Sequence, residues 1–167
     1  MATVRQLINP DEGRFLASGS ATPWQENGAN LPVPGRAFDA SVTSSIFFLR
    51  RLASYGSGSL TLNITWYAAA ASTGVVRWSG AVAKIKPNTD SQDPLTKTFA
   101  TSTDTDDTHL GTVATRVHGH DIVISATDSA AAGDLVWVRL QRLGAHANDN
   151  MAGAAILLDA ELSYSDT

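Results

Sequence analysis

The side chains with the clearest capacity for chemistry are two histidines, His118 and His120, which flank a single glycine. Residues two apart on a strand share one face, so both imidazoles could contact the same metal ion. Gly119 between them instead favours a turn, and neither a glutamate nor a third histidine follows at ligand spacing. The spacing therefore predicts solvated loop histidines, with no metal site and no cofactor.

A run of acidic residues, Asp104, Asp106 and Asp107, has the D-x-D-D spacing of a calcium loop. Calcium takes about six to eight oxygen ligands, and an EF-hand loop adds a glycine and a distal glutamate. Neither of these residues stands at the required position here. We therefore interpret the run as part of a solvated acidic loop over residues 102–108.

The sequence lacks the patterns that mark a catalytic nucleophile or an acid–base pair. It has no G-x-S-x-G turn, and its carboxylates fall in loops and at strand ends rather than as a distinct pair. Gly56-Ser57-Gly58 lacks the lysine and the helix that a phosphate-binding loop needs. The absence of cysteine excludes thiol catalysis and disulfides. These observations predict that the chain is not an enzyme.

Three tryptophans, Trp66, Trp78 and Trp137, are candidates for a sugar-binding platform, because aromatic side chains on an exposed strand face bind glycans. Each, however, lies in a run where every second residue is apolar, most clearly over residues 59–69. This period of two is typical of a strand with one buried face. The pattern favours core packing, or contact at a trimer seam, for all three tryptophans.

The strands that carry these side chains are separated by turn signals along the whole chain. They are predicted over residues 36–42, 45–52, 59–69, 74–85, 95–101, 111–117, 121–126, 134–143 and 151–164. The alanine runs at 68–71 and 130–132 are too short to nucleate a helix. Short strands with short connections predict an all-β fold, an antiparallel β-sandwich, with a jelly roll favoured over an up-and-down barrel.

Residues 1–35 differ from the rest, because prolines and glycines interrupt them. Proline removes a backbone donor and biases the preceding residue toward extended conformations. We therefore predict an extended N-terminal arm, followed by the sandwich domain over residues 36–167. The arm is too apolar for a disordered tail, so it either packs on its own domain or docks on a neighbouring subunit or a host surface. The apolar side chains expected to make such contacts are Val4, Leu7, Ile8, Phe15, Trp24 and Leu31.

The composition predicts a weakly charged surface. Charged residues make up 17% of the chain and apolar residues 43%, whereas about a quarter of an average globular protein is charged. A net charge of −4 and a pI near 5.4 argue against nucleic-acid binding. No apolar run approaches the roughly 20 residues that span a bilayer. Such a surface favours a protein that packs against partners, with neither nucleic acid nor a membrane among them.

Several motifs together resemble a known group of proteins. They are F-F-L-R-R-L at 47–52, the hairpin W-Y-A-A-A-A-S-T-G-V-V-R-W at 66–78, A-G-D-L-V-W-V-R-L-Q-R at 132–142 and M-A-G-A-A-I-L-L at 151–158. The chain resembles tailed-bacteriophage virion proteins with jelly-roll-like domains, which sit as trimeric decoration (cement) proteins on capsids or as small tail-associated proteins. The resemblance covers about residues 36–165, and the arm lies outside it.

The resemblance implies a mechanical function. A capsid decoration protein of this kind binds the outside of the shell as a homotrimer, contacts the major capsid protein and stiffens the lattice. It would belong to the virion, assembled in the host cytoplasm, and the apolar arm would tether it to the capsid or to a neighbouring subunit. The alternative is a carbohydrate- or receptor-binding module of a phage tail or tail fibre.

Overall fold

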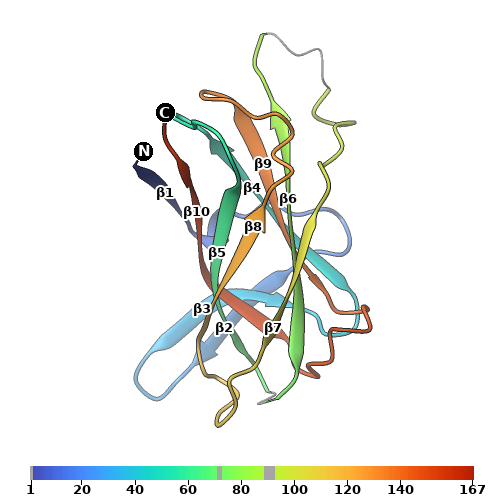
Figure 1. Cartoon of the computed structure of the whole chain (residues 1–167). Coiled ribbons are helices and arrows are strands. Elements are labelled where there is room, and N and C mark those ends of the chain that lie inside the picture. The colour runs from blue at the N-terminus through green and yellow to red at the C-terminus, as the bar shows by residue number, and fades with distance from the viewer. Residues whose placement is uncertain (1, 71–72, 89–92) are drawn as a thin grey trace.

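The computed structural model describes residues 2–70, 73–88 and 93–167 as two antiparallel β-sheets packed face to face (Figure 1). Within these ranges, no helix is long and apolar enough to cross a membrane. A short 3₁₀ turn, η1, spans Pro10–Glu12. The strands are β1 (Thr3–Ile8), β2 (Thr22–Asn27), β3 (Pro32–Phe38), β4 (Thr43–Arg51), β5 (Leu60–Ala68), β6 (Val75–Ile85), β7 (Thr103–Thr108), β8 (His118–Ile124), β9 (Leu135–Leu143) and β10 (Ala155–Ser165).

The strand order is that of a jelly roll. One sheet has the order β2-β3-β10-β5-β8, with β1 also paired to β10, and the other has the order β4-β9-β6-β7. From β3 to β10 the chain therefore changes sheet at every connection except β6 to β7, which pair directly. This interleaving makes two Greek keys. The predicted fold class, an all-β antiparallel sandwich, is confirmed.

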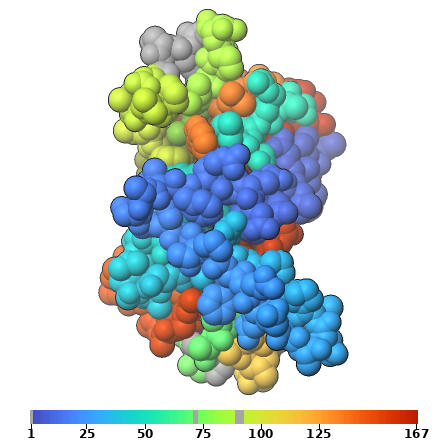
Figure 2. Space-filling model, turned by 180° about the vertical axis from the view of Figure 1, so that it is seen from behind, coloured from blue at the N-terminus to red at the C-terminus, as the bar shows by residue number. Residues whose placement is uncertain are grey.

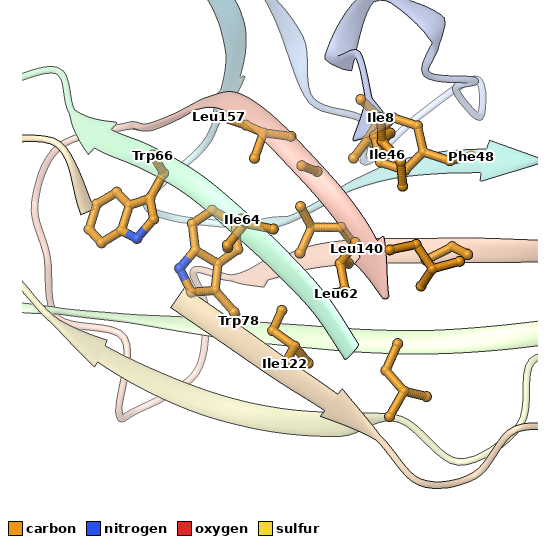
Figure 3. Packing of buried hydrophobic residues seen from close by; sticks show 14 of the residues in the cluster. Ile8, Ile46, Phe48, Leu62, Ile64, Trp66, Trp78, Ile122, Leu140 and Leu157 are labelled. Carbon is orange, nitrogen blue, oxygen red and sulfur yellow. The ribbon is translucent and has the colours of Figure 1, made fainter. Parts of the chain in front are cut away.

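The core lies between the sheets and is built from the inward side chains of each strand. Leu62, Ile64 and Trp66 of β5 are fully buried, and they face Leu140 of β9 across the sandwich (Figure 3). Trp66 packs edge-on against Trp78 of β6, with ring centroids 5.8 Å apart. Burying each such side chain contributes about 1.5–3 kcal/mol, so these rows hold the two sheets together.

The first 35 residues are part of the six-stranded sheet rather than a separate arm. β1 pairs along β10 from Thr3 opposite Ser165 to Ile8 opposite Ala160, and β2 forms a hairpin with β3. The predicted boundary at residue 35 falls inside β3. The reason is the length of β10: β3 pairs with only its first residues, 155–157, and β1 satisfies the backbone groups beyond them.

Three local predictions differ from the structure. The acidic stretch Thr103–Thr108 is strand β7, not a loop, and it pairs with β6. Arg77 of β6 lies between Asp104 and Asp106, at 3.7 and 2.6 Å, so their repulsion is offset across the strand pair. Conversely, residues 95–101 and 111–117 form no strand. Thr112 has a φ of +70° there, a left-handed turn conformation.

Candidate functional site

The outer face of the four-stranded sheet carries an apolar groove of about 400 Å³. Phe47 of β4, Trp137 of β9 and Ala83 of β6 contribute to its lining. Their side chains share a face, because Trp137 stands in register with Ala83 on one side and Leu49 on the other. The small side chain of Ala83 leaves space beside the indole, and this makes the sheet face hollow at that point.

One wall of the groove comes from the segment between η1 and β2. Arg14 and Phe47 exchange two backbone hydrogen bonds, of 2.8 and 3.1 Å, which fix this segment along the edge of β4. Phe15 and Leu16 then line the groove, and they are 41% and 64% exposed. The guanidinium of Arg36 lies 5.2 Å from the ring centroid of Phe15 and supports the ring from outside the groove.

The opposite wall comes from the connection between β6 and β7. Pro94, Leu95, Lys97 and Phe99 line the groove from this side. The Phe99 ring packs 5.9 Å from that of Phe47. Figure 2 shows this face of the molecule, with the blue N-terminal segment across its middle, the yellow-green connection above it, and atoms of β9 and β4 between them.

Specific bonds hold this connection against the sandwich. The Ala100 amide donates to the carbonyl oxygen of Val82, at 2.9 Å. The Lys97 ammonium pairs with Asp128 of the β8–β9 connection at 2.8 Å, and this lysine side chain is only 12% exposed. The wall is therefore anchored at two points, one on β6 and one on the β8–β9 connection between the two sheets.

Cations surround the apolar lining. The Arg139 guanidinium lies 4.7 Å from the Phe99 centroid, and burial lowers the pKa of this arginine below its usual value. A second cavity of about 240 Å³ adjoins the groove and shares Arg14 and Trp137 with it. Glu12 and Arg50 of this second cavity form an ion pair at 2.7 Å.

The lining of the groove is mainly apolar, with two basic side chains. Among the described residues, those that line the larger cavity include no carboxylate, histidine or hydroxyl side chain. Aromatic rings and aliphatic side chains instead offer flat apolar surfaces, and the two basic side chains offer hydrogen-bond donors. This combination, a mostly apolar concave site with a few polar groups, is typical of small-molecule and oligomer binding sites.

The histidines lie elsewhere, at the opposite end of the sandwich core. His118 is 2% exposed and stacks on Trp66, with ring centroids 4.5 Å apart. The ring of His109 lies 4.6 Å from that of His118. His120 contacts the hydroxyl of Thr105 at 2.7 Å. The prediction of solvated loop histidines is therefore wrong: His118 and His120 both belong to strand β8, and His118 is buried as well.

This buried cluster does not form a metal site in the part of the chain that the structure describes, where no group of three or more potential ligands has the required arrangement. Asp107 has another partner: its carboxylate accepts a hydrogen bond of 2.8 Å from the Trp66 indole. Burial lowers the pKa of His118, because it disfavours the imidazolium form. The cluster is thus an internal packing and hydrogen-bonding element.

The three tryptophans that were considered as a sugar-binding platform have different environments. Trp66 and Trp78 are fully buried in the core, whereas Trp137 lies on the outer face, in the groove. Phe47 and Phe99 are its companions in the groove, and neither was predicted as a site residue. No local pattern indicated them, because the register that sets Phe47 opposite Arg139, two residues from Trp137 on the same face of β9, joins strands that are distant in the chain.

The apolar residues of the predicted arm are also distributed over different environments. Ile8 is fully buried, Leu7 and Leu31 are 71% and 69% exposed, and Phe15 lines the groove. Trp24 donates its indole N–H to the Tyr67 hydroxyl at 2.9 Å. The remaining residue, half-buried Val4, packs against the core. Contact with a capsid or a second subunit stays a prediction for these residues.

No family model and no curated protein matches the chain. Solved structures share its fold. The CBM36-1 domain of a multidomain xylanase, from the hindgut metagenome of Trinervitermes trinervoides, has a TM-score of 0.51 at 10% identity, over 98% of this chain and 100% of that domain. The isomalto-dextranase of Arthrobacter globiformis T6, solved with panose, has a TM-score of 0.52 at 16% identity, over 96% of this chain but 23% of the enzyme. At these identities the likeness concerns the β-sandwich fold.

Proposed function

We propose that this chain is a non-catalytic carbohydrate-binding module that holds a glycan in the groove on its four-stranded sheet. The observation that carries the proposal is the aromatic lining: Phe15, Phe47, Phe99 and Trp137 converge on one concave face from separate parts of the chain. The similar fold of the CBM36-1 domain supports the proposal, since that domain is named as a carbohydrate-binding module.

The chemistry of a sugar fits this lining. A pyranose ring has an apolar face of C–H groups, which packs on an aromatic ring, and a rim of hydroxyls that hydrogen-bond to charged or polar donors. Trp137 provides the largest flat surface, and Arg14 and Lys97 provide donors at the walls. The walls are anchored to the sheet, so little ordering is required when a ligand enters.

The first test is binding of the intact protein to a glycan array, followed by titration of the best ligand. We expect Trp137→Ala to reduce affinity at least tenfold, because it removes the main stacking surface. Trp24→Ala is the matched control, a half-buried tryptophan on the other sheet, and it should leave affinity unchanged. A folded wild-type protein that binds no glycan on the array would overturn the proposal.

The second candidate is a structural virion role, as a trimeric decoration protein on the outside of a phage capsid. It is favoured by the sequence resemblance and by large apolar side chains exposed away from the groove, Leu7 and Leu31. Many copies would stabilise a shell together, if each copy buried a modest contact area on the order of 1,000 Å² or more.

The virion role is tested by the mass of the isolated protein in solution and by co-sedimentation with empty phage shells. Deleting residues 1–35 is unsuitable, because it would remove β1, β2 and part of β3. Leu7→Asp and Leu31→Asp change the exposed surface alone, and we expect each to reduce shell occupancy. A monomer that does not co-sediment with shells would rule this role out.

A further inference from the structure

We infer that the groove selects saccharides that carry a carboxylate, the uronic acids, over neutral sugars of the same shape. This inference rests on the proposed function and concerns the same site. It follows from the charges around the groove, which differ in sign from the net charge of −4 of the whole chain.

The side chains that line the two adjoining cavities carry an excess of positive charge. Arg14, Arg50 and Lys97 are basic, and Glu12 is the one acid among the described residues of both linings. Two of the cations are already neutralised, since Arg50 pairs with Glu12 at 2.7 Å and Lys97 with Asp128 at 2.8 Å. The surplus charge at the groove is therefore that of Arg14, together with Arg139 beside it.

Among the described residues, no carboxylate forms an ion pair with Arg139. Its guanidinium lies on the Phe99 ring, and its buried Nε has no hydrogen-bond partner among the described residues. The charge of Asp104 also acts on Arg139, but the carboxylate of Asp104 pairs with Arg77, at 3.7 Å. A partly desolvated guanidinium with free donors gains more from an added carboxylate than a solvated one does, because water competes less for the charge.

Arg14 stands where the two cavities meet. It lines both of them, and among the described residues its side chain donates to the backbone carbonyl of Glu12 alone, at 3.1 Å. The Arg14 side chain is exposed, so it can turn toward a ligand over Trp137. The two arginines differ in position. Arg14 belongs to one wall of the groove, whereas Arg139 lies on the sheet, in register with Phe47. A sugar stacked on Trp137 would have the Arg14 guanidinium at one wall of the groove. The Arg139 guanidinium lines neither cavity, and the Phe99 ring on which it lies holds its charge near the groove.

A carboxylate suits this arrangement better than a hydroxyl. Guanidinium and carboxylate form paired, charge-assisted hydrogen bonds that are roughly twice as strong as neutral ones. The surrounding rings, Phe15 and Phe99, exclude water from one side of that contact and reduce screening. A neutral sugar would keep the stacking contribution of Trp137 but lose the charge contribution of the two arginines.

The test compares short oligosaccharides of galacturonate, glucuronate and mannuronate with their methyl esters, which keep the ring and remove the charge. Titration of the intact protein at low salt should give at least tenfold tighter binding of one free acid than of its ester. That preference should shrink several-fold in 0.5 M NaCl, where charges are screened within about 4 Å. It should also be lost in the double variant Arg14→Gln/Arg139→Gln.

Two variants make the result specific. Arg139→Lys keeps the charge but loses the paired donors, so it should retain part of the preference. Arg5→Gln is the matched control: Arg5 is an exposed arginine paired with Glu161 on the other sheet, at 2.7 Å, and its loss should change nothing.

The outcomes separate the two proposals. Equal binding of acid and ester, or binding of neutral glycans alone, overturns the selectivity and leaves the carbohydrate-binding proposal standing. A preference for the acid that persists in the double variant overturns the assignment to Arg14 and Arg139. A folded protein that binds no saccharide of either kind overturns both proposals.

Discussion

Arg142 is a charged side chain at an inward position of the sandwich, on the row of β9 that also holds Val138 and Leu140. It is fully buried and makes a two-pronged contact with Asp149, at 2.8 and 2.9 Å. It also donates to the carbonyl oxygens of Phe38, Met151 and Gly153. All its hydrogen bonds lead to the β9–β10 connection or the end of β3, so one side chain fixes that end of the molecule.

Removing this arginine should destabilise the fold strongly, because the Asp149 carboxylate would stay buried without its partner. We expect Arg142→Met to lower the free energy of unfolding by about 3–5 kcal/mol in urea denaturation. Arg5→Gln, which breaks an exposed ion pair, should change it by less than about 1 kcal/mol. A loss from Arg142→Met no larger than that of the control would show that the pair is not a structural clamp.

His118 makes the stability depend on pH. Burial holds the pKa of this imidazole below its usual value, and the neighbouring Asp107, which acts in the opposite direction, does not offset it. Below about pH 6.5 this imidazole binds a proton in the unfolded chain more readily than in the folded chain. The free energy of unfolding therefore falls as the pH decreases through that range. Above it, both states are neutral and His118 contributes no pH dependence.

We therefore expect the melting temperature to fall between pH 7.5 and pH 5, and to fall less in His118→Phe, which keeps a ring stacked on Trp66. His146→Gln, in an exposed loop, should behave like the wild type. The measurement is thermal unfolding at a series of pH values. Equal slopes for the wild type and His118→Phe would contradict this role of His118.

At the level of elements, β1 shows how an edge of the sheet is completed. It pairs with the backbone of β10 beyond β3, over residues 160–165, and its exposed side chains alternate with half-buried ones up to Ile8, which is buried. Leu7 and Ile8 are adjacent and similar in size, yet one is 71% exposed and the other fully buried. Only one face of β1 therefore packs against the core, and substitutions of Ile8 and Leu7 measure the two faces separately.

We predict that Ile8→Ala lowers the free energy of unfolding by about 2–5 kcal/mol, the usual cost of such a truncation in a core. Leu7→Ala, next to it, should change the free energy by less than about 0.5 kcal/mol. Denaturant titration of both variants checks this. Similar small losses for the two would mean that β1 contributes little to the stability of the sandwich.

For the whole molecule, the closeness of the two chain ends is a defining feature. The Ala2 amide donates to the Asp166 carboxylate at 2.8 Å, and the Asp166 amide donates to the Ala2 carbonyl at 3.0 Å. Both ends lie together at one end of the sandwich (Figure 1). The residues of β1 and β10 that pair are therefore separated by nearly the whole chain. Contacts between such distant residues predict slow folding.

A circular permutant should keep the fold. Joining the termini with a short Gly/Ser linker and opening the chain between Gly111 and Thr112, in the β7–β8 connection, leaves every strand intact. We expect the same circular dichroism spectrum and cooperative unfolding. A permutant that fails to fold under conditions in which the original chain is folded would show that the order of strands along the chain matters more than their pairing.

The alternation of apolar and polar residues was sufficient to predict a two-sheet antiparallel fold and the inward row of β5. A period of two determines which residues share a face, and in β5 only one face is apolar. In β9 both rows contain large apolar residues, so the pattern that predicted core packing or a trimer seam for Trp137 fits Val138 as the inward residue equally well.

Only the tertiary structure decided that choice, because the partners of each row come from distant parts of the chain. Arg142 can be buried only where Asp149 and three carbonyl groups meet it, and this turns Trp137 outward. The same dependence on distant partners places Phe99 over Phe47. The sequence alone thus determined the two-sheet antiparallel class of the fold. The groove depended on the tertiary structure, because its walls are adjacent in space and not in the chain.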